Sequence, residues 1–275
     1  MDLLGRVSTM SIVYMTISAV LALLVPIALI VFMGVKKRLK WKAMLFGALL
    51  FVVFALILER IMHALVLGAD PTQSAIYKNP VLYMLYGGFA AGIFEETARL
   101  LCFKSFLKVK NNESIYTGIS YGLGHGGIEA ILVGGIAAVG NLVTSVMLNS
   151  GMLKAVTAAM SGQQLDKFNQ GMNGLVNTPS YMFLVSGGER MIALVLQIAL
   201  SLFVFKAVVE KKWQYFAYAI LIHAGIDMLA VLFQRGIIKN VFLLEGIILL
   251  ATVAVAIVAF KINKKKAMPE QTSLE

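Results

Sequence analysis

Long apolar runs are the feature that most constrains this chain. Seven stretches of the 275-residue sequence are long and carry few charged side chains, and roughly 20 apolar residues in a helix cross a bilayer core about 30 Å thick. Helices satisfy their own backbone hydrogen bonds in lipid. The sequence therefore predicts an all-α, polytopic transmembrane helix bundle of about seven spans, at residues 10–33, 43–67, 80–103, 114–141, 180–205, 213–233 and 240–260.

The composition excludes an ordinary soluble protein. Hydrophobic residues make up 59% of the chain and charged residues only 14%, whereas a soluble domain needs more charge to cover its surface. The net charge of +10 would suggest nucleic acid as a partner. The basic residues instead cluster beside the spans, where they face the headgroups of a lipid bilayer, so we expect no nucleic-acid partner. Without an internal repeat or linker, we expect one transmembrane domain over residues 1–275.

The lysines and arginines predict the orientation. Fifteen follow the first, third, fifth and seventh spans, six lie on the opposite side, and three lie within spans. The positive-inside rule then puts the amino terminus outside and the carboxyl terminus in the cytoplasm. The longest connection, 142–179, lies outside, and both a membrane-surface helix near 152–168 and a solvated loop are compatible with it. The lysine-rich, tryptophan-poor composition favours the cytoplasmic membrane of a bacterium.

Ten acidic or histidine residues fall inside the predicted spans. A charge near the bilayer centre costs at least about 2.5–3.5 kcal/mol, so such groups pair with each other, face water or take part in chemistry. They are Glu59, Glu95, Glu96, Glu129, Glu189, Asp227, Glu245, His63, His125 and His223. Two adjacent acid–base pairs, Glu59-Arg60 and Glu189-Arg190, lie at a similar depth and predict structural ion pairs that cross between the second and fifth spans.

A double glutamate stands one helical turn before an arginine in the third span. Arg99 follows Glu95 by four residues and Glu96 by three, so its guanidinium can reach either carboxylate. One carboxylate then pairs with Arg99, and the other is left to act as a general base. An ion pair that only packs the helix explains the motif equally well.

Two histidines are each followed by an acid four positions later, which places both side chains on one helix face. These are His125 with Glu129 and His223 with Asp227. The carboxylate can orient the imidazole or join it in binding a metal. Counted along the helices, both histidines lie about level with Glu95. Five glycines between 118 and 127 allow a neighbouring helix, or a peptide, to approach the backbone closely.

The three motifs together resemble the glutamate-dependent intramembrane peptidases. That group includes the PrsW proteases and the type II CAAX prenyl endopeptidases with their bacteriocin-processing relatives. Residues 80–230 are most similar to the YhfC-type membrane peptidase family, in the glycine-rich context of His125 and in Gly188-Glu189-Arg190. The position of Arg99 and the presence of Asp227 depart from the CAAX pattern, so prenylated substrates are not expected.

The resemblance implies an intramembrane protease that hydrolyses a membrane-embedded or membrane-adjacent peptide. Its catalytic residues would be Glu95, Glu96, Arg99, His125 and His223. Either Glu95 or Glu96 would hold the attacking water, and Glu129 and Asp227 would orient the histidines. His125, His223 and Glu96 could bind Zn²⁺, or the histidines could stabilise the oxyanion with no cofactor at all. The alternatives are a proton-coupled transporter and a non-catalytic scaffold or immunity relative.

Overall fold

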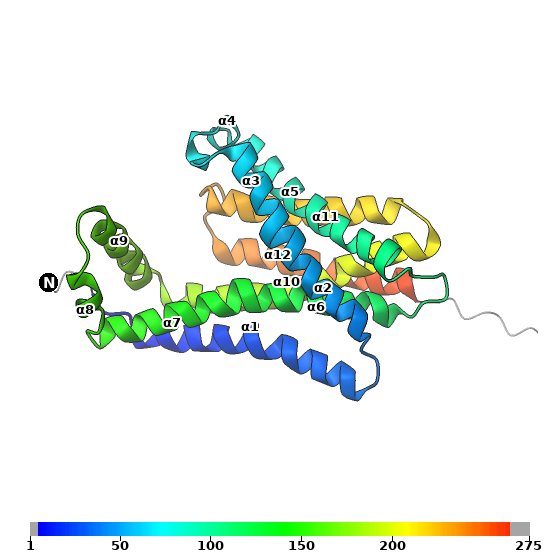
Figure 1. Cartoon of the computed structure of the whole chain (residues 1–275), viewed down its shortest axis with the longest axis horizontal. Helices are drawn as coiled ribbons and strands as arrows, with labels where there is room; N and C mark the ends of the chain where they lie inside the picture. The colour runs from blue at the N-terminus through cyan, green and yellow to red at the C-terminus, as the bar shows by residue number, and fades with distance from the viewer. Residues whose placement is uncertain (1–4, 265–275) are drawn as a thin grey trace, which may run out of the picture. The chain divides into compact units, whose positions relative to one another are not determined.

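The computed structural model describes residues 5–264, which are helical apart from short connections (Figure 1). The expected all-α class is therefore confirmed. Six helical stretches in the described part are long and apolar enough to cross a membrane. They are α1 (Thr9–Val35), the run Trp41–Leu67, the run Ile115–Asn149, α10 (Ser180–Glu210), α11 (Gln214–Gln234) and α12 (Val241–Asn263).

The remaining expected span corresponds to α5 (Pro80–Leu101), a 22-residue helix. The Asn79 side chain accepts hydrogen bonds from the N–H groups of Val81 and Leu82, and Pro80 occupies the first helical position, where its missing N–H costs nothing. This helix carries the Glu95, Glu96 and Arg99 motif and is less apolar for that reason. The orientation of the chain in the membrane stays a prediction.

Three π-helical segments interrupt or extend these helices. The run Trp41–Leu67 consists of α2 (Trp41–Phe51), η1 (Val52–Glu59) and α3 (Arg60–Leu67), and the run Ile115–Asn149 consists of α6 (Ile115–Glu129), η4 (Ala130–Gly135) and α7 (Ile136–Asn149). The third segment, η3 (Cys102–Phe106), continues α5. Such segments are rare in proteins, and those that occur are often found at functional sites. Here η1 ends at Glu59 and η4 begins directly after Glu129, which hydrophobic periodicity does not predict.

The long connection is helical but broken. It contains α8 (Leu153–Ala158) and α9 (Gln163–Asn177), separated at Gly162, whose φ of +54° suits glycine. The boundaries expected for a single surface helix near 152–168 were therefore wrong, since the chain turns within that range. Short elements also fill the connection before α5, namely η2 (Pro71–Gln73) and α4 (Ala75–Lys78). Asp70 precedes η2, and hydrogen bonds from the Thr72 hydroxyl and N–H lower the pKa of its carboxyl group.

The chain divides into two compact units, 1–51 with 120–197 (unit 1) and 52–119 with 198–275 (unit 2). In unit 1, α1 packs along η4 and α7 (Figure 1). The Asn149 side chain fixes the start of α1, because it accepts from the N–H of Val7 and donates to the carbonyl of Val7 at 2.9 Å each. The expected organisation as one transmembrane domain stays a prediction.

In unit 2 the closest packing is between α5 and α11 (Figure 1). Gly88 and Gly92 face α11, where an added Cβ would lie 2.5 Å from the carbonyl oxygen of Ala224 and 3.0 Å from that of Ile220, respectively. The spacing is the small-xxx-small pattern that brings membrane helices together. At the far end of α11, Arg235 stacks over the Tyr77 ring at 4.3 Å, a cation–π contact that ties α11 to α4.

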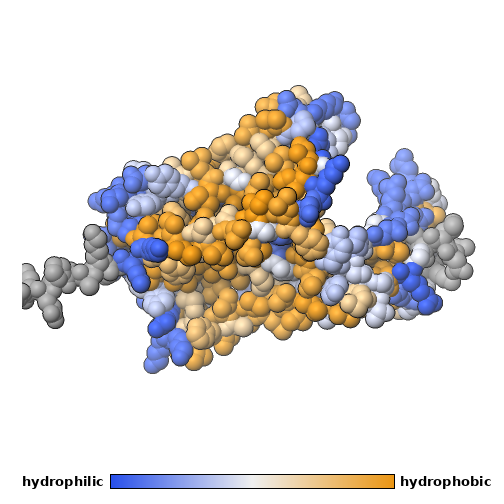
Figure 2. All heavy atoms as spheres, turned by 180° about the vertical axis from the view of Figure 1, so that it is seen from behind, coloured by the Kyte–Doolittle hydropathy of each residue, from blue (hydrophilic) through white to orange (hydrophobic). Residues whose placement is uncertain are grey.

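On the face shown in Figure 2, apolar side chains cover the middle of the helices, and hydrophilic residues gather towards their ends. Leu24, Leu65 and Leu250 are 55%, 80% and 72% exposed. So many exposed large apolar side chains would be an aggregation hazard in water. They suit contact with lipid tails, as the apolar runs of the sequence predict.

Candidate functional site

The double glutamate and His223 come together in unit 2. They follow from the close approach of α5 and α11 at Gly92, because Glu95 and Glu96 lie one turn further along α5 and His223 lies one turn beyond Ile220 on α11. Glu96 and Arg99 are completely buried, and His223 is 3% exposed. Buried ionisable groups persist only when they satisfy one another, and this cluster does so through direct contacts.

Glu96 is the centre of this cluster. Its Oε1 atom accepts a hydrogen bond from Arg99 Nη1 at 2.6 Å and lies 2.8 Å from His223 Nδ1. Because a carboxylate only accepts, Nδ1 carries the hydrogen, and the other ring nitrogen, Nε2, is directed elsewhere. Glu96 Oε2 is buried and has no hydrogen-bond partner among the residues that the structure describes. Glu96 thus fixes both the tautomer and the orientation of His223.

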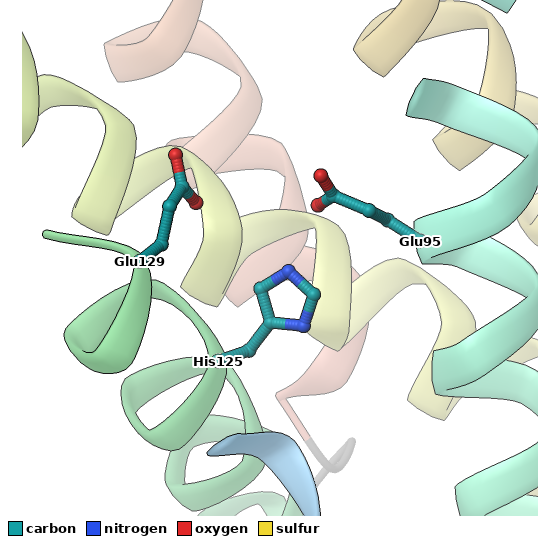
Figure 3. Close-up of side chains that lie close together, drawn as sticks. All are labelled: Glu95, His125 and Glu129. Carbon is teal, nitrogen blue, oxygen red and sulfur yellow. The ribbon is translucent and has the colours of Figure 1, made fainter. Parts of the chain in front are cut away.

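Two further carboxylates face the remaining nitrogen of His223. Glu95 projects from α5 (Figure 3), and its Oε2 lies 3.8 Å from His223 Nε2, while Asp227 Oδ2 lies 3.6 Å from the same atom. Both separations exceed a direct hydrogen bond. Glu95 Oε2 is also 3.7 Å from Arg99 Nη2, so the guanidinium is closer to Glu96 than to Glu95. The two neighbouring glutamates therefore have different surroundings.

Ser201 completes the cluster from α10. Its Oγ accepts a hydrogen bond from Arg99 Nε at 3.1 Å, and both side chains are fully buried. Ser201 therefore holds the guanidinium in the plane from which it reaches Glu96. Sequence reasoning did not select this residue, because a single serine in an apolar span carries little signal of its own.

Replacing Ser201 by alanine is expected to lower the free energy of unfolding by about 1–3 kcal/mol, because the Arg99 Nε–H would stay buried without its acceptor. Detergent-solubilised protein can be unfolded by titration and followed by circular dichroism. Ser145→Ala is the matched control, since Ser145 is equally buried but bonds no charged group: its hydroxyl contacts the Asn141 carbonyl of its own helix and Met15 Sδ at 3.5 Å. Equal losses in both variants would contradict a specific role for Ser201.

Unit 1 contains the other histidine–acid pair. His125 and Glu129 lie one turn apart on α6, with their side chains on the same side of the helix (Figure 3), and each offers a ligand atom within 4.8 Å of the other's. His125 is completely buried. Phe51 of α2 meets its ring edge-on, with centroids 5.0 Å apart. These contacts limit rotation of the imidazole and keep it on the face that Glu129 shares.

Glu129 is held on both oxygens. Arg190 Nη1 donates to Oε1 at 3.1 Å, and Gln197 Nε2 donates to Oε2 at 2.7 Å. Arg190 also pairs with its neighbour Glu189. Gln197 was not selected beforehand, and the expectation that Glu129 orients His125 stays a prediction.

Three of the four residues expected to form crossed ion pairs, Glu59, Glu189 and Arg190, have other partners within their own units. Arg190 contacts Glu129 and Glu189 in unit 1, whereas Glu59 Oε1 lies 3.2 Å from His63 Nε2 in unit 2. The crossed pairing of Glu59 and Arg60 with Glu189 and Arg190 stays a prediction.

The glycines of α6 serve helix packing. A Cβ at Gly124 would lie 1.9 Å from the Met44 carbonyl oxygen, and one at Gly47 would lie 2.2 Å from the Tyr121 carbonyl oxygen. The backbones of α2 and α6 therefore touch at these two positions. Of the two interpretations left open by the sequence, tight packing holds at Gly124. This packing also brings Phe51 to His125.

Comparisons with known proteins agree on one family. The model of the family described as "YhfC intramembrane metalloprotease" matches residues 21–248. The "Uncharacterized membrane protein YhfC" of Bacillus subtilis (strain 168) is 36% identical over 244 residues, which cover 89% of this chain and 93% of that protein. No solved structure matches.

Proposed function

Because the chain belongs to the YhfC intramembrane metalloprotease family, a family of multi-pass bacterial membrane proteins, we propose that it is an endopeptidase that cleaves a membrane-embedded or membrane-adjacent peptide. The buried cluster of Glu95, Glu96, Arg99 and His223 carries this proposal. Burying four ionisable groups between two apolar helices costs free energy. Their arrangement places the fixed imidazole of His223 beside the Glu95 carboxylate, which lies beyond hydrogen-bond distance of Nε2.

The two glutamates take different roles in this proposal. Glu96 is fixed by Arg99 and by His223 Nδ1, so it orients the histidine. Glu95 lies on the side of Nε2, at 3.8 Å, where a bound water would contact both groups. Glu95 therefore holds the attacking water and takes its proton, which is the role of a general base. Arg99 holds the Glu96 carboxylate in place.

The donor groups fit a zinc site. Histidine nitrogens with a carboxylate form a common catalytic zinc set, and a zinc-bound histidine usually donates its other ring N–H to a carboxylate. His223 has this arrangement, with Nδ1 on Glu96 and Nε2 left for a metal. His125 and His223 would be the nitrogen ligands. Glu96, expected from the sequence as a tentative third ligand, contacts the opposite nitrogen and is the orienting group in this proposal. The carboxylate of the set would come from the Nε2 side of the ring, where Asp227 Oδ2 lies 3.6 Å away.

When bound, zinc would polarise the scissile carbonyl and lower the pKa of water. The chain's own groups do the rest in this proposal. Glu95 accepts the proton of the water and returns it to the leaving amine. Glu129 keeps the His125 ring oriented through its bonds to Arg190 and Gln197, and Asp227 lies beside Nε2 of His223. Apolar helices exclude bulk water, which strengthens each of these interactions.

Zinc analysis of purified protein tests this assignment. We expect about one zinc per chain in the wild type, and its loss in both His125→Ala and His223→Ala. The third histidine provides the matched control, because His63→Ala removes an imidazole that bonds Glu59 and Tyr86 and should leave the zinc content unchanged. Zinc that survives in both site variants would overturn the metal assignment.

A cleavage assay separates a peptidase from a carrier or scaffold. The protein can be reconstituted in liposomes with a panel of fluorescein-labelled transmembrane peptides, and products can be resolved on gels. Cleavage by the wild type that is lost in the His125 and His223 variants supports the proposal. Stoichiometric zinc without cleavage of any peptide, while His125→Ala abolishes accumulation of a solute in the liposomes, would favour a transporter.

A further inference from the structure

An open groove of about 570 Å³ lies in unit 2, and its lining contains none of the residues of the α5 and α11 cluster. The π-helical segment η1 supplies Ala55, Leu56 and Glu59 to the lining of the groove. Arg60 and His63 of α3 follow, and the turn towards η2 completes the lining. Along the chain, the lining residues are thus first apolar, then charged, and finally part of the connection that follows α3.

The polar groups in the groove are partnered, with one exception. His63 lies 2.7 Å from the Tyr86 hydroxyl through Nδ1 and 3.2 Å from Glu59 through Nε2, and the Tyr86 hydroxyl contacts Met62 Sδ at 3.0 Å. Arg60 has no ion pair or hydrogen bond within the described part of unit 2 and is exposed. The Glu59 carboxylate has His63 as a partner, whereas the guanidinium of Arg60 can bind an external anion.

The depth of Arg60 indicates which anion it meets. Gly68, where α3 has ended, follows Arg60 by eight positions, so the two lie about 12 Å apart along the helix. Each headgroup layer is roughly 5–8 Å thick. If the turn after α3 sits at the outer edge of that layer, the Arg60 backbone lies just inside the hydrocarbon. A long arginine side chain extends from there to the headgroup level, where phosphates are the abundant anions.

We propose that this groove is a binding site for a phospholipid, whose phosphodiester group pairs with Arg60 and whose acyl chain lies along Ala55 and Leu56. The neighbouring outer face of the helix favours a lipid over a peptide, because Ile57, Ile61 and Leu65 are 48%, 52% and 80% exposed and offer apolar contact without polar groups for a peptide backbone. The guanidinium binds phosphate through two parallel hydrogen bonds. This inference does not depend on the proposed peptidase activity.

Native mass spectrometry of the delipidated full chain in detergent tests the site. Three probes are added, phosphatidylglycerol, phosphatidylethanolamine and diacylglycerol with the same acyl chains. Both phospholipids are expected to bind, and diacylglycerol, which lacks the phosphate, is not. Arg60→Gln should weaken phospholipid binding about tenfold, and Arg60→Lys, which keeps the charge but loses the two parallel hydrogen bonds, should weaken it less than Arg60→Gln does. Arg60 is exposed, so these variants should fold; circular dichroism checks that they do.

Two further variants test for unspecific charge attraction and for a competing carboxylate. Lys78→Gln removes an exposed cation at the end of α4, outside the groove, and should leave binding unchanged; an equal loss there would show unspecific charge attraction and overturn the proposal. Glu189→Gln tests whether Arg60 is already engaged by that carboxylate, in the crossed ion pair that the sequence predicts. Phospholipid binding that appears only in this variant, unchanged binding in Arg60→Gln, or equal binding of diacylglycerol would each overturn the phospholipid site in the wild-type chain.

Discussion

Replacing Glu95 by glutamine is expected to lower peptide cleavage by about 10²- to 10⁴-fold, the usual contribution of a general base. Glutamine keeps the size of the side chain and removes its ability to accept a proton. Because glutamine has the same shape and both zinc-binding histidines remain, the substitution should leave the fold and the zinc content intact. Cleavage of the transmembrane peptide panel, with zinc measured on the same samples, gives both quantities.

Glu189→Gln is the matched control for this experiment. This variant makes the same substitution in another spanning helix. The Glu189 side chain is 39% exposed and pairs with Arg190, so the rate of cleavage should not change. Glu96→Gln tests the division of roles, because it should impair His223 positioning and therefore zinc retention as well as cleavage. A Glu95→Gln protein that cleaves at the wild-type rate would remove Glu95 as the base, and the roles of the two glutamates would have to be exchanged.

The helical spans were predictable because they depend on local composition. Apolar runs of about 20 residues have few alternatives in a bilayer, and charged or proline-containing ends mark them clearly. The expected 180–205 and 213–233 correspond to α10 and α11 within five residues at each end. The π-helical segments were not predictable, since an inserted residue depends on which neighbours the helix packs against and leaves no change in hydropathy.

The sequence could single out candidate residues but not their contacts, and of those residues Glu95, Glu96, Arg99 and His223 lie together in unit 2; their roles stay predictions. Costly ionisable residues at helical spacing identified Glu95, Glu96, Arg99, His125 and His223 without any knowledge of tertiary structure. The spacing could not tell which glutamate Arg99 would choose, because both are within one turn. Gln197 and Ser201 were missed although they follow Arg190 by seven and eleven residues, a spacing that puts all three on one face of α10. That polar stripe is a usable signal for other chains.

Replacing Arg99 by methionine is expected to destabilise the protein by about 3–5 kcal/mol, the cost of leaving one member of a buried ion pair without its partner. Arg99 and Glu96 are both fully buried, and their closest atoms are 2.6 Å apart. Methionine fills similar space but supplies no charge, so the Glu96 carboxylate would lose its main counter-charge. Unfolding of the detergent-solubilised protein by titration, followed by circular dichroism, measures the loss.

The double variant Arg99→Met with Glu96→Gln separates charge from packing. If the loss in Arg99→Met comes from the uncompensated carboxylate, removing that charge as well should restore more than half of the lost stability, because buried ion pairs contribute little when both members are replaced. Activity should stay low, since Glu96 also orients His223 through Nδ1. A double variant as unstable as Arg99→Met would show instead that the guanidinium acts by packing and by its hydrogen bond to Ser201. Recovered stability without recovered activity would mean that this ion pair is kept for the geometry of the site, at no gain to the fold.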